Sequence, residues 1–384
     1  KDRANGGYTD IYIDGSKVGT VYTYNYDDMV CTGGSSYWGT TGLSPGKHII
    51  SVVPQESWRE QYIWAFRPSG SYDTTAPNNP TNISVSTSVA QQTWTNAASP
   101  SFTWTGATDN SAGVEGYEVY FGTSSTATSG TYQITNTYTA SFLSTGKYYL
   151  RLRTRDAANN NASWTTMYEY WVDTASPTVV SGLSELSGVA NNTWQKTINS
   201  PSFSWSASND TDSGLAGYNV YWGTSATGTG TLQTEAGYSH PLVADTGTYY
   251  LRVNSQDNAG NQTAYTTFVF KYDISNPTPT LGISGTAGSN GWYTSSVNLN
   301  PSGTDIGSGL ANAYVSVDSG TWSGSTTISS SGSHSISYRA VDNVGNESTI
   351  NGSIKVDLED PTVSPSVVSG ILGENGWYTV APVI

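Results

Sequence analysis

Short alternations of apolar and polar residues run through most of the chain. Over residues 148–153, Tyr148, Leu150 and Leu152 alternate with a tyrosine and two arginines, and residues 117–121 show the same spacing. A period of two predicts β-strands with one buried and one wet face. Clusters of Gly, Ser, Thr, Asn and Asp separate these runs at turn spacing, and we find no convincing helical period. The pattern predicts an all-β protein.

The strand pattern repeats itself along the chain. The run at 116–123 (GYEVYFGT) recurs at 217–224 (GYNVYWGT), and the run at 146–153 recurs at 247–254. A unit of about one hundred residues with seven or so short strands is typical of an Ig-like β-sandwich. The tyrosine pair that opens the second motif stands where such folds place a tyrosine corner. We therefore predict tandem β-sandwiches.

An Asp-x-x-x-Pro sequence follows a strand-like run at four places, which begin at Asp73, Asp173, Asp273 and Asp357. Proline fixes its own φ and holds the residue before it extended, so we expect short, semi-stiff joints between domains. These joints predict five segments: 1–72, 73–175, 176–275, 276–358 and 359–384.

The motifs carry a resemblance to known modules. Segments 73–175 and 176–275 resemble bacterial fibronectin type III or Ig-like modules of large secreted and cell-surface proteins, on their Gly-Tyr-x-Val-Tyr and Tyr-x-Leu-Arg strands. Segment 276–358 resembles a shorter Ig-like repeat, on Asn290-Gly-Trp-Tyr293 and Asp342-Asn-Val-Gly-Asn346. The resemblance implies tandem Ig-like or fibronectin III-like β-sandwiches.

The two ends resemble incomplete modules. Residues 1–72 look like the latter part of a jelly-roll of carbohydrate-binding type, and 359–384 repeats the opening of the shorter Ig-like module at Asn375-Gly-Trp-Tyr378. Both would leave unpaired strand edges. We therefore expect either a longer polypeptide, which we favour, or another subunit that donates the missing strands.

Composition narrows the classes of function. The net charge of −14 repels phosphate backbones and anionic lipid headgroups, and no apolar run approaches the length of a membrane helix. Nucleic acid and membranes are therefore poor partners. A single cysteine, Cys31, and three scattered histidines leave little for disulfides, zinc or acid–base chemistry.

One sequence matches a nucleophile motif. Gly42-Leu-Ser-Pro-Gly46 fits G-x-S-x-G, but a strand follows it where the motif needs a helix, so we interpret it as a hairpin turn. We predict no catalytic residues and no enzyme in this segment.

Aspartates recur at equivalent places in the repeats. Asp109, Asp210 and Asp305 each precede a glycine by four residues, and a second set ends strands before Asn-rich turns. Oxygen ligands near domain ends suit Ca²⁺, which takes six to eight, whereas the alternative is that these residues only cap turns. The best single candidate is Asp210-Thr-Asp212-Ser-Gly214. The candidate Ca²⁺ ligands are Asp109, Asp156, Asp173, Asp210, Asp212, Asp257, Asp273, Asp305, Asp342 and Asp357.

Aromatic and basic side chains raise two further hypotheses. Trp38, Trp58 and Trp64 of the jelly-roll-like segment could stack on sugar rings, although rings of this kind more often fill a core. An outward arginine stripe over residues 151–155 is expected to pair across strands with carboxylates, and Glu118 is a suitable partner.

The function that these features predict is mechanical. We expect an extracellular, bacterial cell-surface array of β-sandwiches that acts as a stalk, adhesin, surface layer or filament component, and that associates with itself or with other surface proteins. The alternative is a carbohydrate-binding and spacer region of a larger secreted polysaccharide-active protein, in which the jelly-roll binds polysaccharide.

Overall fold

The computed structural model describes residues 7–23, 50–54, 73–364 and 371. The chain divides into two compact units. The first comprises residues 1–178 with 209–216 and 256–263, and the second comprises 179–208, 217–255 and 264–384. The described residues are strands, turns and one short 3₁₀ turn, η1 (Ser289–Gly291), so the all-β prediction is confirmed.

A small antiparallel sheet occupies the described N-terminal residues. Its order is β2-β1-β3, and its strands are β1 (Gly7–Ile13), β2 (Ser16–Thr23) and β3 (Ile50–Pro54). Asp14 and Gly15 join β1 to β2 with φ values of 50° and 80°. Two positive φ values match the twist of a two-residue hairpin, which explains the Asp-Gly sequence. The remainder of the jelly-roll-like segment lies outside the described residues.

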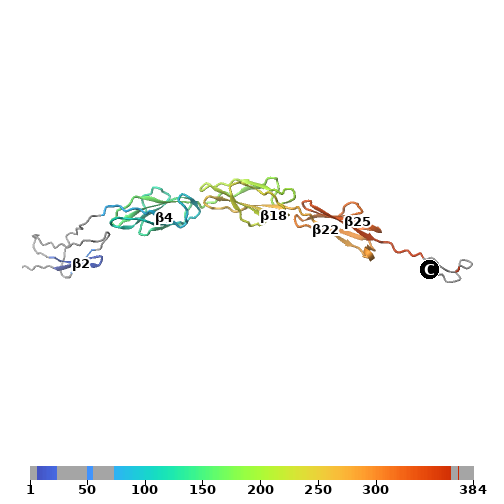
Figure 1. Cartoon of the computed structure of the whole chain (residues 1–384), viewed down its shortest axis with the longest axis horizontal. Coiled ribbons are helices and arrows are strands. Elements are labelled where there is room, and N and C mark those ends of the chain that lie inside the picture. Colours follow the sequence, from blue (N-terminus) through green and yellow to red (C-terminus); the bar gives the residue numbers. More distant parts are fainter. Residues whose placement is uncertain (1–6, 24–49, 55–72, 365–370, 372–384) are drawn as a thin grey trace, which may run out of the picture. The chain divides into compact units, whose positions relative to one another are not determined.

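Sandwich 1 packs a three-stranded sheet against a five-stranded one. The small sheet, which holds the strand labelled β4 in Figure 1, has the order β4-β6-β9. The large sheet has the order β5-β11-β10-β7-β8. The strands are β4 (Asn82–Val85), β5 (Trp94–Thr95), β6 (Ser101–Thr105), β7 (Val114–Gly122), β8 (Thr131–Gln133), β9 (Thr137–Thr139), β10 (Gly146–Asp156) and β11 (Thr165–Val172).

Sandwich 2 repeats this topology, with sheets β12-β14-β17 and β13-β19-β18-β15-β16. Its strands are β12 (Ser181–Glu185), β13 (Trp194–Gln195), β14 (Ser202–Ser206), β15 (Leu215–Gly223), β16 (Thr231–Gln233), β17 (Gly237–Ser239), β18 (Gly247–Asp257) and β19 (Thr266–Tyr272).

Sandwich 3 is shorter, with sheets β20-β22-β24 and β21-β26-β25-β23. Its strands are β20 (Thr278–Ser284), β21 (Trp292–Tyr293), β22 (Val297–Thr304), β23 (Leu310–Val317), β24 (Thr326–Ile328), β25 (Gly332–Asp342) and β26 (Glu347–Val356).

Alternate residues of both sheets form each core. In sandwich 1, Phe102 and Trp104 of β6 are buried against Leu150 and Leu152 of β10, and the Trp104 ring lies edge-on to Tyr117 at 5.4 Å between centroids. Aromatic rings thus supply much of the buried apolar area. The predicted tyrosine corner is present, because the Tyr148 hydroxyl donates to the Ser144 carbonyl at 3.0 Å.

Candidate cation sites

Three groups of aspartates converge at equivalent positions of the three sandwiches. In each group, one carboxylate oxygen of every residue lies within 4.8 Å of one from each of the other two. The groups, here called triads 1, 2 and 3, are Asp73, Asp109 and Asp156; Asp173, Asp210 and Asp257; and Asp273, Asp305 and Asp342.

Each triad draws its residues from three separate segments. In triad 3, Asp273 directly follows β19, the last strand of sandwich 2. Asp305 follows β22 and begins a loop, and Asp342 is the last residue of β25. One carboxylate therefore comes from a joint, and two come from loops and strand ends of the sandwich that follows.

The second aspartate of each triad shapes a tight five-residue loop. The Gly309 backbone N–H donates to Asp305 Oδ2 at 2.7 Å, and Gly309 has a φ of +87°. Gly113 and Gly214 make the same contacts, at 2.8 and 2.7 Å, with φ values of +79° and +81°. A positive φ favours glycine, which explains the Asp-x-x-x-Gly spacing. These aspartates therefore organise turns, as one sequence interpretation predicted.

An asparagine connects the joint to the third aspartate. Asn346 Nδ2 donates to the Asp273 carbonyl at 3.2 Å and to Asp342 Oδ2 at 2.7 Å. Asn160 makes the corresponding contacts at 3.0 and 2.9 Å, and Asn261 makes them at 2.9 and 2.7 Å. The sequence placed these asparagines in Asn-rich turns but gave them no role at the site. The Asp-x-x-x-Asn spacing that ends each long strand is the signal that marks them.

Hydrogen bonds favour the charged form of two joint carboxylates, Asp173 and Asp273. Asp273 accepts from the Ser308 N–H at 2.6 Å, the Ser275 N–H at 3.0 Å and the Thr246 hydroxyl at 3.2 Å. Burial raises the pKa of Asp273, but these hydrogen bonds outweigh burial and lower the pKa below its ordinary value. The same balance lowers the pKa of Asp173.

The donor set fits a hard divalent cation. Asp109 Oδ1 and Asp305 Oδ1 are buried without a hydrogen-bond partner. Ion pairs between described residues use other carboxylates. A Cβ at Gly307 would lie 2.3 Å from Asp273 Cγ, so the loop approaches this carboxylate closely. Clustered carboxylate oxygens with unused lone pairs are the chemistry of a Ca²⁺ site.

The other candidate ligands lie outside the triads. Asp212 is exposed, and its N–H donates to Asp210 at 3.1 Å. Asp357 is exposed and accepts from the Glu359 N–H at 3.1 Å. Among the glycan candidates, Trp38, Trp58 and Trp64 all lie outside the described residues, as does the turn at 42–46.

The arginine stripe of β10 pairs with carboxylates. Arg153 forms an ion pair with Glu118 at 2.9 Å, as predicted, and Arg155 pairs with Glu115 at 2.8 Å. Arg151 instead is buried and donates to the Ala127 carbonyl. The stripe therefore stabilises the large sheet of sandwich 1.

Comparison with known proteins identifies the class of module. Residues 130–278 match the bacterial Ig-like domain (group 3) family, over a range that runs from sandwich 1 through sandwich 2. This confirms the resemblance to bacterial Ig-like modules. Such a module is non-catalytic.

The chain is also similar to parts of larger enzymes. It is 31% identical to Exoglucanase B of Cellulomonas fimi over 312 residues, which cover 78% of this chain and 26% of that protein. It is 33% identical to Chitinase A1 of Niallia circulans over 279 residues, which cover 67% of this chain and 36% of that protein. The chain thus spans between a quarter and two fifths of these relatives. Within the described ranges, no helix has the length and apolar character needed to cross a membrane.

Proposed function

We propose that this chain is a non-catalytic, extracellular spacer region of a secreted bacterial protein that acts on polysaccharide, and that Ca²⁺ bound at each triad fixes the joint ahead of each sandwich. The observation that carries the proposal is the threefold recurrence of one triad. Turn formation accounts for each aspartate alone. It does not require three of them to meet at one point, three times in succession.

A cation at a triad would link covalently distant segments. In triad 3 it would bind Asp273 of the joint together with Asp305 and Asp342 of sandwich 3. Three carboxylates supply at least three of the six to eight oxygen ligands that Ca²⁺ takes, and backbone carbonyls, hydroxyls or water would supply the rest. The joint, already restricted by its proline, would then lose freedom relative to the sandwich.

The names of the relatives support polysaccharide as the class of partner. Two proteins that match most of this chain are named for polysaccharides, an exoglucanase and a chitinase. A cell-surface stalk, adhesin or filament would use the same array of sandwiches and the same bound cations. The names of these two relatives favour a polysaccharide-active protein over a cell-surface stalk, adhesin or filament.

Calcium titration of the full chain tests the proposal. After chelation, isothermal titration calorimetry is expected to give three Ca²⁺ ions per chain, one for each triad. Asp109→Asn, Asp210→Asn and Asp305→Asn should each remove one ion. Asp212→Asn is the matched control, because Asp212 is an exposed neighbour outside the triad. An absence of binding at millimolar Ca²⁺, or a stoichiometry unchanged by the triad variants, would refute the proposal.

A further inference from the structure

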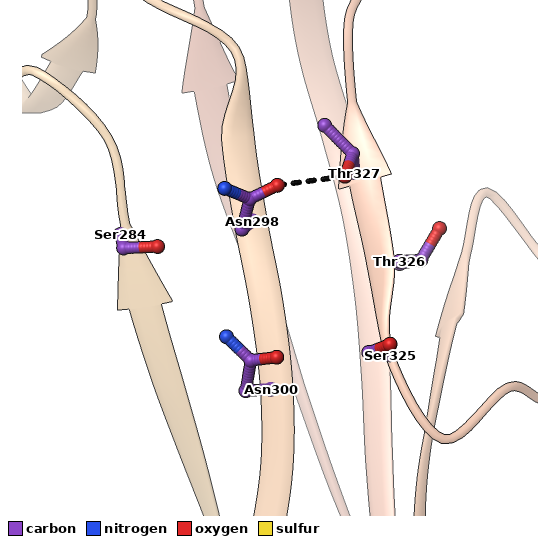
Figure 2. Close-up of a pocket in the computed structure, with 6 residues that line it drawn as sticks. All are labelled: Ser284, Asn298, Asn300, Ser325, Thr326 and Thr327. Atoms are coloured by element: carbon purple, nitrogen blue, oxygen red, sulfur yellow. Dashed lines mark hydrogen bonds between the residues drawn. The ribbon is translucent and has the colours of Figure 1, made fainter.

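The small sheet of every sandwich presents an outer face made of short, uncharged polar side chains. In sandwich 3 these residues come from β20, β22 and β24 and surround an open pocket (Figure 2). The pocket is lined by Ser284, Asn298, Asn300, Ser325, Thr326 and Thr327.

Two amide side chains lie side by side in this face. Asn298 and Asn300 are two residues apart on β22 and are both exposed, and Ser284 of β20 is opposite Asn298. The Thr327 hydroxyl donates to Asn298 Oδ1 at 2.7 Å (Figure 2). Among the described residues, Asn298 Nδ2 and the Asn300 amide have no hydrogen-bond partner. These groups are therefore available to a ligand.

In the corresponding faces of the other two sandwiches, more of the polar side chains form hydrogen bonds with one another. Ser101 and Thr139 share a hydrogen bond of 2.9 Å across β6 and β9, and Ser202 and Ser239 share one of 2.9 Å across β14 and β17. Those faces carry mostly hydroxyls. The face of sandwich 3 is the one that places two neighbouring amides beside a pocket.

Charge is absent from these faces although the chain is strongly acidic. Of the strands in the three small sheets, β12 alone has a charged residue, Glu185, which is 5% exposed and accepts from the Ser187 N–H at 2.8 Å. In the three sandwiches, the ion pairs between described residues involve the large sheets, for example Arg339 with Glu347 in sandwich 3. A partner of this face meets hydrogen-bonding groups without meeting charge.

We propose that the outer face of the small sheet of sandwich 3, centred on Asn298 and Asn300, binds an uncharged polysaccharide chain. This inference rests on the polysaccharide partner of the proposed function. An amide donates and accepts hydrogen bonds, and so does a sugar hydroxyl, whereas the net charge of −14 disfavours an anionic polymer. Each hydrogen bond contributes little net free energy, so several sugar units must bind at once.

Binding of the full chain to insoluble cellulose and to insoluble chitin tests this surface. The variant Asn298→Asp/Asn300→Asp keeps the shape of both side chains but replaces their donors with oxygen and adds charge. We expect the affinity of this variant for whichever of the two polymers the wild type binds to fall about tenfold. The matched control is Asn312→Asp/Asn351→Asp, which adds the same charge at exposed asparagines on the large sheet of the same sandwich.

The outcomes separate this inference from the proposed function. Loss of binding in the face variant alone, with three Ca²⁺ ions retained, supports the inference, and comparison of cellulose with chitin identifies the polymer. An equal loss of polysaccharide binding in the control variant, or no loss in the face variant, overturns the inference. Neither result bears on the proposed spacer with Ca²⁺ at its triads. If the wild type binds neither polymer, the inference fails, and calcium stoichiometry still tests the triads. A sedimentation coefficient that falls only in the face variant would identify this face as a contact between copies and would also overturn the inference.

Discussion

Replacing Asp305 with asparagine should change stability in opposite directions with and without calcium. Asp305 Oδ2 accepts backbone N–H groups from Gly307 at 3.0 Å and Gly309 at 2.7 Å, while its Oδ1 is buried without a partner. The asparagine keeps one oxygen for the loop and replaces the other with NH₂. The variant therefore removes a charge and a cation ligand while leaving the turn intact.

The charges of triad 3 give the magnitude without calcium. Two unit charges 4.8 Å apart repel by about 3.5 kcal/mol at an effective dielectric constant of about 20, and Asp305 takes part in two such pairs. Water and salt screen part of this repulsion. A net relief of about 1 kcal/mol would already raise the Tm of a domain of this size by roughly 4–8 °C.

Calcium reverses the sign because the wild type then gains binding free energy that the variant lacks. A ligand at one hundred times its Kd stabilises the folded state by about 2.7 kcal/mol. Calorimetry of the full chain in chelator and in Ca²⁺ measures both effects, and hydrogen exchange over β22–β25 assigns the transition to sandwich 3. Asp212→Asn should show no reversal. If Asp305→Asn shifts the Tm in the same direction in both conditions, the electrostatic account of the triad is wrong.

Two further predictions concern sandwich 3. Gly307→Ala should remove one of the three Ca²⁺ ions and spare the other two, because its Cβ would lie 2.3 Å from Asp273 Cγ; calorimetric stoichiometry measures this, and three retained ions would contradict it. The hydrogen bond that His334 Nδ1 donates to Asp318 raises the pKa of His334 and lowers that of Asp318. The stabilisation from this pair should be complete between the ordinary aspartate and histidine pKa values. It should be lost as pH rises through the raised pKa of His334 or falls through the lowered pKa of Asp318, and NMR titration in wild type and Asp318→Asn should give the lower His334 pKa in the variant.

The fold was predictable from the sequence where a strand has one buried and one solvent-exposed face. Phe102 and Trp104 of β6 are 0% and 1% exposed, and the residue between them is exposed, so the period of two appears directly in the sequence. The two-residue strands β5, β13 and β21 are different. Each pairs in parallel with the last strand of its large sheet, and two residues are too few to show any period.

Eight of the nine triad aspartates were candidates from the sequence, but Asp73 was placed only at a joint, and the grouping was not predictable. Spacing to glycine marked Asp109, and the end of a strand before an Asn-rich turn marked Asp156, because local hydrogen bonds fix both turns. The meeting of these residues with Asp73 depends on which loops share one end of the sandwich, and a single sequence does not contain that information. Asp212 illustrates this, since it neighbours Asp210 in the sequence but is exposed and lies outside triad 2.

The turn and calcium interpretations of these aspartates are compatible, because a carboxylate has two oxygens. Asp109 Oδ2 accepts the Ser111 N–H at 2.9 Å and the Gly113 N–H at 2.8 Å, and Oδ1 remains buried and unused. The hydrogen bond from Ser111 is the main cause of the lowered pKa of Asp109, so the turn itself keeps the carboxylate ionised. An ionised carboxylate beside two others needs a cation more than a neutral one does. The turn that explains the aspartate locally therefore leaves its second oxygen available to the proposed Ca²⁺.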